Sequence, residues 1–311
     1  MNNEIYISSS PLQGYTDYIY RRAHRKFFGG IDNYYTPFLR VEKGEYRSKD
    51  LRDLSKDNND ELCIPQLLPD GSQELLRMFD TLREMGWNEC DLNFGCPFPM
   101  LVKRGKGSGM LKNLRVLEDV AKTILDNKDM RVSVKMRLGY DDAEQGLNAL
   151  DLLNSLDLVH ITCHARLGID KYTSQLRLDD FQVFYEKCTQ PLVYNGNVDN
   201  VKTANELIER FPNLKGFALG RPLLQNPNLA TEIKNGNEEK ITREQLRDFH
   251  KELAHAYSEN YTGGDHQVLS KLKTIWDYLL DGKFPKEIKK IKKSTSLSKY
   301  NEGVNELLRQ M

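Results

Sequence analysis

The chain lacks any apolar run long enough to cross a membrane, and its first ten residues lack a basic segment followed by an apolar one. A membrane-spanning helix needs about 20 consecutive apolar residues, and a secretory signal needs the basic-then-apolar pattern. The five cysteines include no CxxC pair, so the sequence favours neither a disulfide framework nor a zinc site. We therefore expect a cytoplasmic protein with reduced thiols and no bound metal.

The chain also has no net charge, because its 311 residues include 45 basic and 45 acidic ones. Composition alone thus gives no sign of a nucleic-acid partner, and any such surface must be local. Hydrophobic residues make up 39% of the chain and charged residues 29%, a balance that is typical of globular proteins and excludes a disordered chain. This length accommodates one large domain with a smaller appendage.

What the sequence does contain is an alternation of short apolar or β-branched runs with helix-like segments. Such alternation is typical of consecutive βα units. Eight units that end near residue 235 predict one (β/α)8 barrel. The predicted strands are residues 4–8, 33–36, 63–67, 89–93, 131–136, 158–164, 192–195 and 216–219, and the predicted helices include residues 72–85, 114–126 and 201–210.

The composition changes after residue 237. Thr242 and Gln245 form a Thr-x-x-Gln capping box, which is typical of the start of a helix. Further helices are predicted around residues 269–280, 285–293 and 300–308. We therefore divide the chain into a catalytic barrel, residues 1–237, and a small all-helical domain, residues 238–311.

Polar side chains follow most of the predicted strands. In a (β/α)8 barrel the active site lies at the carboxyl ends of the strands, so these side chains are expected to meet in one site. They are Gln66, Asn93, Lys135, Arg137, His164, Arg166, Asn195 and Arg221.

The last two βα loops contain Asn195-Gly-Asn197 and Gly220-Arg221-Pro222. Barrels commonly hold a phosphate at this place, where glycine permits close approach of the backbone and arginine can offer two parallel hydrogen bonds. Each motif by itself is also an ordinary turn. Their joint placement favours a phosphate site.

Three side chains have chemistry suited to such a site. Lys135 is suited to support a flavin, by placing positive charge beside the edge where a flavin collects negative charge on reduction; the alternatives are a solvated lysine and a Schiff-base lysine. His164 is suited to donate a hydrogen bond to a cofactor or substrate, with a structural histidine as the alternative. Cys96 lies on a loop stiffened by glycine and proline, and its thiol, mostly protonated near neutral pH, is suited to donate a proton.

Seven motifs, in order, resemble the dihydrouridine synthase family from about residue 8 into the tail. They are Pro11-Leu-Gln-Gly-Tyr-Thr-Asp17, Pro65-Gln-Leu-Leu68, Asp91-Leu-Asn-Phe-Gly-Cys-Pro97, Ser133-Val-Lys-Met-Arg-Leu-Gly139, His164-Ala-Arg166, Asn195-Gly-Asn197 and Gly220-Arg221. Any one of these motifs is weak evidence of a resemblance, but seven motifs in the family's order are strong evidence. The resemblance implies an FMN-binding barrel followed by a helical domain that binds tRNA.

The resemblance also implies a reaction and a role for each site residue. The C5–C6 double bond of specific uridines in tRNA would be reduced to dihydrouridine, with NADPH as the reductant of FMN, hydride transfer from flavin N5 to C6, and Cys96 as the proton donor to C5. Asn93, Arg166 and Tyr172 would contact the extruded base. The residues implied to hold FMN are Pro11, Leu12, Gln66, Lys135, His164, Asn195, Asn197, Gly220 and Arg221.

Three positions depart from the family pattern: Leu12 replaces a methionine, Ala165 a glycine and Asp170 a glutamine. Leu12 should pack similarly, whereas the other two leave the target nucleotide open. The sequence also leaves open tRNA versus rRNA, NADPH versus NADH, and the oligomeric state. Alternative readings are an FMN barrel that acts on a small molecule, an aldolase-like barrel, and an RNA-binding barrel without catalysis.

Two basic segments are candidates for contact with RNA. Residues 103–110 combine three glycines with three cations, and residues 286–293 hold five lysines and one glutamate. We expect the first to be a flexible basic lip and the second a phosphate-contacting stripe on a helix. The alternative in both places is an ordinary solvated surface.

Overall fold

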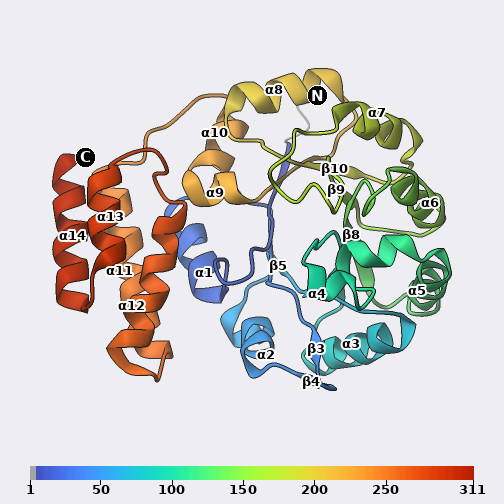
Figure 1. Cartoon of the computed structure of the whole chain (residues 1–311), viewed down its shortest axis with the longest axis horizontal. Coiled ribbons are helices and arrows are strands. Elements are labelled where there is room, and N and C mark those ends of the chain that lie inside the picture. The colour runs from blue at the N-terminus through green and yellow to red at the C-terminus, as the bar shows by residue number, and fades with distance from the viewer. Residues whose placement is uncertain (1–4) are drawn as a thin grey trace.

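A computed structural model describes residues 5–311 and contains the predicted (β/α)8 barrel (Figure 1). Its strands pair in parallel in the order β5-β2-β1-β11-β10-β9-β8-β7-β6. The segments β5 and β6 are consecutive and separated by Pro65, which has no N–H to donate. Because β5 pairs with β2 and β6 pairs with β7, the sheet closes on itself.

The strands are β1 (Tyr6–Ser9), β2 (Asn33–Tyr35), β5 (Cys63–Ile64), β6 (Gln66–Leu67), β7 (Glu89–Phe94), β8 (Arg131–Arg137), β9 (Ile161–His164), β10 (Leu192–Asn195) and β11 (Gly216–Leu219). The first predicted strand began at Glu4, which lies outside the described residues, and the sixth begins three residues later than predicted. The other predicted strands lie within one residue of the observed ones, apart from the break at Pro65.

Helices surround the barrel (Figure 1). They are α1 (Tyr18–Phe27), α2 (Ser48–Leu54), α3 (Ser72–Glu84), α4 (Pro99–Val102), α5 (Leu114–Asp126), α6 (Glu144–Leu153), α7 (Leu178–Lys187), α8 (Val201–Arg210), α9 (Arg221–Gln225) and α10 (Leu229–Asn235), with 3-10 turns η1 (Lys56–Asn58) and η2 (Gly107–Lys112). The predicted bounds of α5 and α8 are confirmed.

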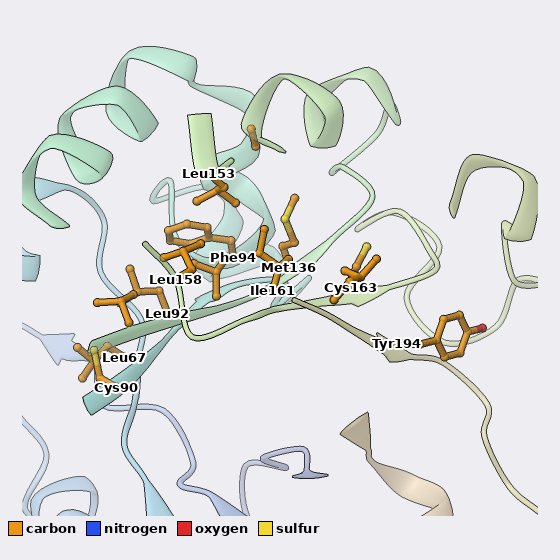
Figure 2. Close-up of a cluster of buried hydrophobic side chains, with 14 of the residues drawn as sticks. Leu67, Cys90, Leu92, Phe94, Met136, Leu153, Leu158, Ile161, Cys163 and Tyr194 are labelled. Atoms are coloured by element: carbon orange, nitrogen blue, oxygen red, sulfur yellow. The ribbon is translucent and has the colours of Figure 1, made fainter. Parts of the chain in front are cut away.

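Strand residues alternate between the outer helices and the barrel interior. Leu92 and Phe94 of β7 lie with Met136 of β8 in the apolar layer between the sheet and the helices (Figure 2). The residues at the alternate positions, such as Asp91 and Lys135, face inward, where Asp91 accepts hydrogen bonds from side chains of neighbouring strands. This period of two is what directs the polar side chains to the mouth of the barrel.

The tail consists of α11 (Arg243–Asn260), α12 (Gly264–Thr274), η3 (Ile275–Asp277), α13 (Pro285–Lys293) and α14 (Leu297–Gln310). The capping box is confirmed, because the side chains of Thr242 and Gln245 each bond the other's backbone N–H. The helix predicted over residues 269–280 is shifted: it starts at Gly264 and gives way to η3 at Ile275.

The tail shares a hydrophobic core with α1, which stands between it and the rest of the barrel (Figure 1). Phe249 of α11 has its ring centroid 6.0 Å from that of Tyr20 and 5.0 Å from that of Phe28. The Tyr257 hydroxyl donates to Asp17 at 3.0 Å. The helical tail is therefore tied to the loop after β1, and a domain boundary at residue 237 stays a proposal.

A short antiparallel hairpin, β3 (Val41–Glu42) and β4 (Glu45–Tyr46), was not predicted. Its two turn residues, Lys43 and Gly44, both have positive φ, 55° and 86°, as a two-residue hairpin turn requires. Within residues 5–311, no helix is both long enough and apolar enough to span a membrane.

Candidate active site

A cleft of about 180 Å³ opens at the carboxyl ends of the strands. Most of the predicted site residues line it: Pro11, Leu12, Asn93, Cys96, Lys135, His164, Tyr172, Asn195, Asn197, Gly220 and Arg221. Gln66 and Arg166 do not. Arg137, which the carboxyl-end rule had placed here without a specific role, also lines the cleft. Phe38 lines it too and was not predicted, because a rule that collects polar side chains passes over an apolar residue two positions after a strand.

The cleft is positively charged. Its lining includes Lys135, Arg137 and Arg221 but no aspartate or glutamate, and within residues 5–311 none of these three cations makes an ion pair. Arg137 instead donates to three backbone carbonyl groups at 2.8–3.0 Å. Carbonyls orient a guanidinium without neutralising it, so the cleft keeps a field that favours an anionic ligand.

Lys135 projects from β8 into the wall of this cleft. Its Nζ donates to Asn195 Oδ1 at 3.1 Å, and Asn195 is held in turn by a bond from its Nδ2 to the carbonyl of Ala218. Burial, together with the charge of Arg137, lowers the pKa of Lys135 to about 8. The ammonium is therefore mostly present at neutral pH but is lost just above it.

His164 ends β9 with a defined proton position. Its Nε2 lies 3.1 Å from Nη1 of Arg166, and because arginine only donates, Nε2 must accept. Burial and the surrounding cations hold the pKa of His164 well below its usual value, so the ring is neutral with its proton on Nδ1. Arg166 also donates to Asn197 Oδ1. Arg166 itself does not line the cleft, but it fixes the positions of His164 and Asn197, which do.

The loop after β7 holds Cys96 from both sides. Asn93 Oδ1 accepts from the N–H groups of Gly95 at 3.1 Å and Cys96 at 2.9 Å. The Cys96 carbonyl accepts from both the N–H and the Oγ of Ser108 at 3.0 Å. Gly107 has a φ of 59°, and a Cβ there would lie 2.5 Å from that carbonyl. Burial raises the pKa of the Cys96 thiol, which keeps it protonated near neutral pH.

Gln66 lies beneath the cleft and is fully buried. Its Oε1 accepts from Asn93 Nδ2 at 2.8 Å, and its Nε2 donates to Asp91 at 2.6 Å. Asp91 also accepts from Ser133 at 2.8 Å, and burial raises its pKa to about 6. Here Gln66 orients Asn93, and its role toward a cofactor stays a prediction.

Tyr172 lies over the cleft on the loop after β9, with Arg221 Cζ 4.4 Å from its ring centroid. Asp170, one of the departures from the family pattern, accepts from the N–H of Leu167 at 2.9 Å and from Arg177 at 2.7 Å. The aspartate thus braces the loop that carries Tyr172.

The basic lip expected over residues 103–110 is corrected by the structure. Lys106 is buried and pairs with Glu74 at 2.5 Å, and Gly109 packs so closely that a Cβ would lie 2.5 Å from the Val102 carbonyl. Within this segment only Lys103 and Arg104 are exposed cations. Gly107 and Gly109 serve close packing beneath the Cys96 loop, whereas Gly105 has open space around it.

Solved structures with the same fold include the old yellow enzyme from Trypanosoma cruzi, with a TM-score of 0.55, 11% identity and coverage of 83% of this chain and 95% of that one. Morphinone reductase in complex with tetrahydroNAD has a TM-score of 0.53 at 10% identity and covers 77% and 89%. Likeness at such low identity shows the barrel fold alone.

Sequence relatives are more specific. The chain is 28% identical over 241 residues to the probable tRNA-dihydrouridine synthase of Helicobacter pylori, covering 75% of this chain and 71% of the relative. It is 29% identical over 237 residues to the tRNA-dihydrouridine(16) synthase of Pseudomonas syringae pv. tomato, covering 73% and 74%. The family model of dihydrouridine synthases matches residues 8–308. The predicted resemblance is thereby confirmed, and the chain belongs to the dihydrouridine synthase family.

Proposed function

We propose that the protein reduces the C5–C6 double bond of uridines in tRNA to dihydrouridine, with FMN as cofactor and NADPH as reductant. One observation carries the proposal: a cleft that, among the described residues, is lined by three cations and no carboxylate opens at the barrel mouth beside a thiol that burial keeps protonated. Family membership and the names of the relatives support the reaction and the substrate.

The residues of the cleft fit FMN. Arg221 makes no ion pair within residues 5–311, so a phosphate would supply its missing partner. Asn197 lines the same cleft, and its φ of 48° marks a tight turn on the cleft wall. Lys135 and the Nδ1–H of His164 would hold the polar edge of the flavin ring. When bound, FMN supplies the hydride for C6 of the uracil.

Cys96 supplies the proton for C5 in this proposal. Its half-buried thiol keeps the proton at neutral pH, while nearby Arg137 and Lys135 stabilise the thiolate that remains after the transfer. Asn93 holds the backbone of the cysteine, so the thiol is presented at a fixed place on the cleft wall. Such general acid catalysis typically contributes 10²- to 10⁴-fold to the rate.

We also assign tRNA binding in part to the helical tail. The five lysines of α13 are exposed, but Lys290 pairs with Glu306 at 2.5 Å and Lys292 with Asp277 at 2.6 Å. Within residues 5–311, Lys286, Lys289 and Lys293 make no ion pair. These three are the lysines available to phosphate groups.

The decisive variant is Cys96→Ala. It should retain FMN and its reduction by NADPH while slowing dihydrouridine formation in unmodified tRNA about 10²- to 10⁴-fold, because the thiol acts only when the uracil is protonated. Half-buried Cys188 is outside the cleft, so Cys188→Ala is the matched control and should turn over normally.

Two results would overturn the proposal. One is a folded wild-type protein that cannot be reconstituted with FMN. The other is a yellow wild-type protein that makes no dihydrouridine in tRNA but reduces a small unsaturated carbonyl compound, which would favour a barrel acting on small molecules.

A further inference from the structure

A second groove, of about 500 Å³, lies beside the cleft. It is larger than the cleft by the same measure, and the two share Gln13, Phe38 and Cys96 as lining residues. One wall comes from the segment that leads into the β3–β4 hairpin, and the other from α4. The sulfur-bearing residue of the proposed reaction therefore stands on the boundary between two adjoining spaces.

The α4 wall exposes apolar side chains that a folded chain normally covers. Phe98 is 50% exposed and Met100 is 65% exposed, and both line the groove. They follow Cys96 by two and four residues on a loop fixed by Asn93 and Ser108. Their surfaces are thus held beside the thiol, open to a ligand with a flat apolar face.

The opposite wall carries one guanidinium, that of Arg40, and one carboxylate, that of Glu42. Arg40 lines the groove with its Nε buried and without a hydrogen-bond partner within residues 5–311, and its contact with Glu42 is long, 3.5 Å. A second guanidinium, that of Arg104, stands on the α4 side of the groove; it is exposed and makes no ion pair in the same part of the chain. Guanidinium groups next to an aromatic ring and a thioether form the kind of surface on which unstacked bases and their phosphates bind.

We propose that this groove binds an unpaired nucleotide next to the target uridine in the same RNA strand. Its base stacks on Phe98 and Met100, and its phosphate lies near Arg40 and Arg104. The inference rests on the proposed function, because a base held at Cys96 belongs to a strand that must continue across the adjoining rim. Since stacking tolerates all bases, the groove selects uridines in single-stranded surroundings rather than a flanking sequence.

The test measures the Kd of an unmodified tRNA transcript for the FMN-loaded protein without NADPH. Stacking is worth about 1 to 3 kcal/mol per base, so Phe98→Ala/Met100→Ala should raise the Kd roughly 5- to 150-fold. Its flavin content and NADPH-driven flavin reduction should equal those of the wild type. Exposed Leu76 and Leu125 on the outer helices provide the matched control, Leu76→Ala/Leu125→Ala, with an unchanged Kd.

A modified RNA makes the test specific for the neighbouring base. After the product uridine has been mapped, transcripts carry an abasic residue directly before or after it. For the wild type, one of the two abasic transcripts should bind roughly 5- to 150-fold more weakly. The Phe98→Ala/Met100→Ala variant should show no further loss with that transcript, because the stacking surface is already gone.

The inference is wrong if the Phe98→Ala/Met100→Ala variant binds unmodified tRNA with the wild-type Kd. It is also wrong if the abasic transcript weakens binding to this variant as much as it weakens binding to the wild type. It also falls if the variant raises the KM for NADPH and leaves the tRNA Kd unchanged, since the groove would then hold a dinucleotide. Failure of the proposed function is a separate result, because the wild-type protein itself would then form no dihydrouridine.

Discussion

Positive charge gathers at two places in this molecule, and the two are built differently. At the barrel mouth, half-buried Lys135 and buried Arg137 lie among carbonyl and amide oxygens, and no carboxylate of residues 5–311 lines the cleft. On α13 the lysines are exposed, and two of the five are paired with Glu306 and Asp277. The first arrangement holds cations in fixed positions at a cost in stability, and the second leaves them mobile and screened.

The difference shows what each region can recognise. Desolvated, unneutralised charge interacts strongly with an anion placed beside it and little with bulk salt. Exposed lysines attract a phosphate backbone over a longer range, and salt weakens that attraction steeply. Substitutions at the mouth should therefore change affinity for a small ligand and the stability of the protein, whereas substitutions on α13 should change the salt dependence of RNA binding.

The largest effect is expected for Lys135→Met in the FMN-free protein. The pKa of Lys135 is about 8 when folded and 10.5 as the reference value, so the unfolded chain binds more protons between these pH values and stability rises with pH there. Below pH 8 the buried charge lowers the free energy of unfolding by roughly 3 kcal/mol. The methionine variant should recover much of this at pH 7 and lose the rise between pH 8 and 10.5.

Urea unfolding at a series of pH values measures this, with exposed Lys122→Met as the control. If the Lys135→Met variant is no more stable than the wild type at pH 7 and keeps the same pH dependence, the charge of Lys135 does not destabilise the protein without FMN.

A smaller effect is expected for Arg221→Ala. Losing one charge-assisted contact to phosphate costs about 1.5 to 3 kcal/mol, which weakens FMN binding roughly ten- to a hundredfold. Flavin fluorescence titration checks it. Arg210, which pairs with Asp179 on the outer surface, supplies the control Arg210→Ala, and equal flavin affinity in the two variants would move the phosphate site elsewhere.

The smallest effect in free energy is expected on α13. Replacing Lys286, Lys289 and Lys293 with glutamine should flatten the plot of log affinity for tRNA against log salt by about one unit for each lost phosphate contact. The matched variant Lys290→Gln/Lys292→Gln should change it less, because carboxylates already neutralise those lysines. Equal slopes in both variants and the wild type would remove α13 from the RNA surface.

The barrel and most of the lining residues could be predicted because their signals are local. A period of two directs alternate side chains inward, and the carboxyl-end rule then collects the polar ones at one mouth. Lys106 was misjudged because its partner, Glu74, lies 32 residues away, and no pattern around the lysine reveals a buried pair. Gln66 was placed on the wall for the same reason, since Asp91 and Asn93 of the next strand occupy its amide.

The shared core of α1 and α11 has a consequence for synthesis on the ribosome. The apolar face of α1 emerges early, but Phe249, which covers it, is made more than 200 residues later. At about 5 to 20 residues per second, that interval lasts on the order of 10 to 45 seconds. The pairing of β1 with β11 imposes a similar delay on barrel closure. During that interval the nascent chain carries an uncovered apolar helix face and an open sheet edge, the two features that favour aggregation of incompletely folded chains.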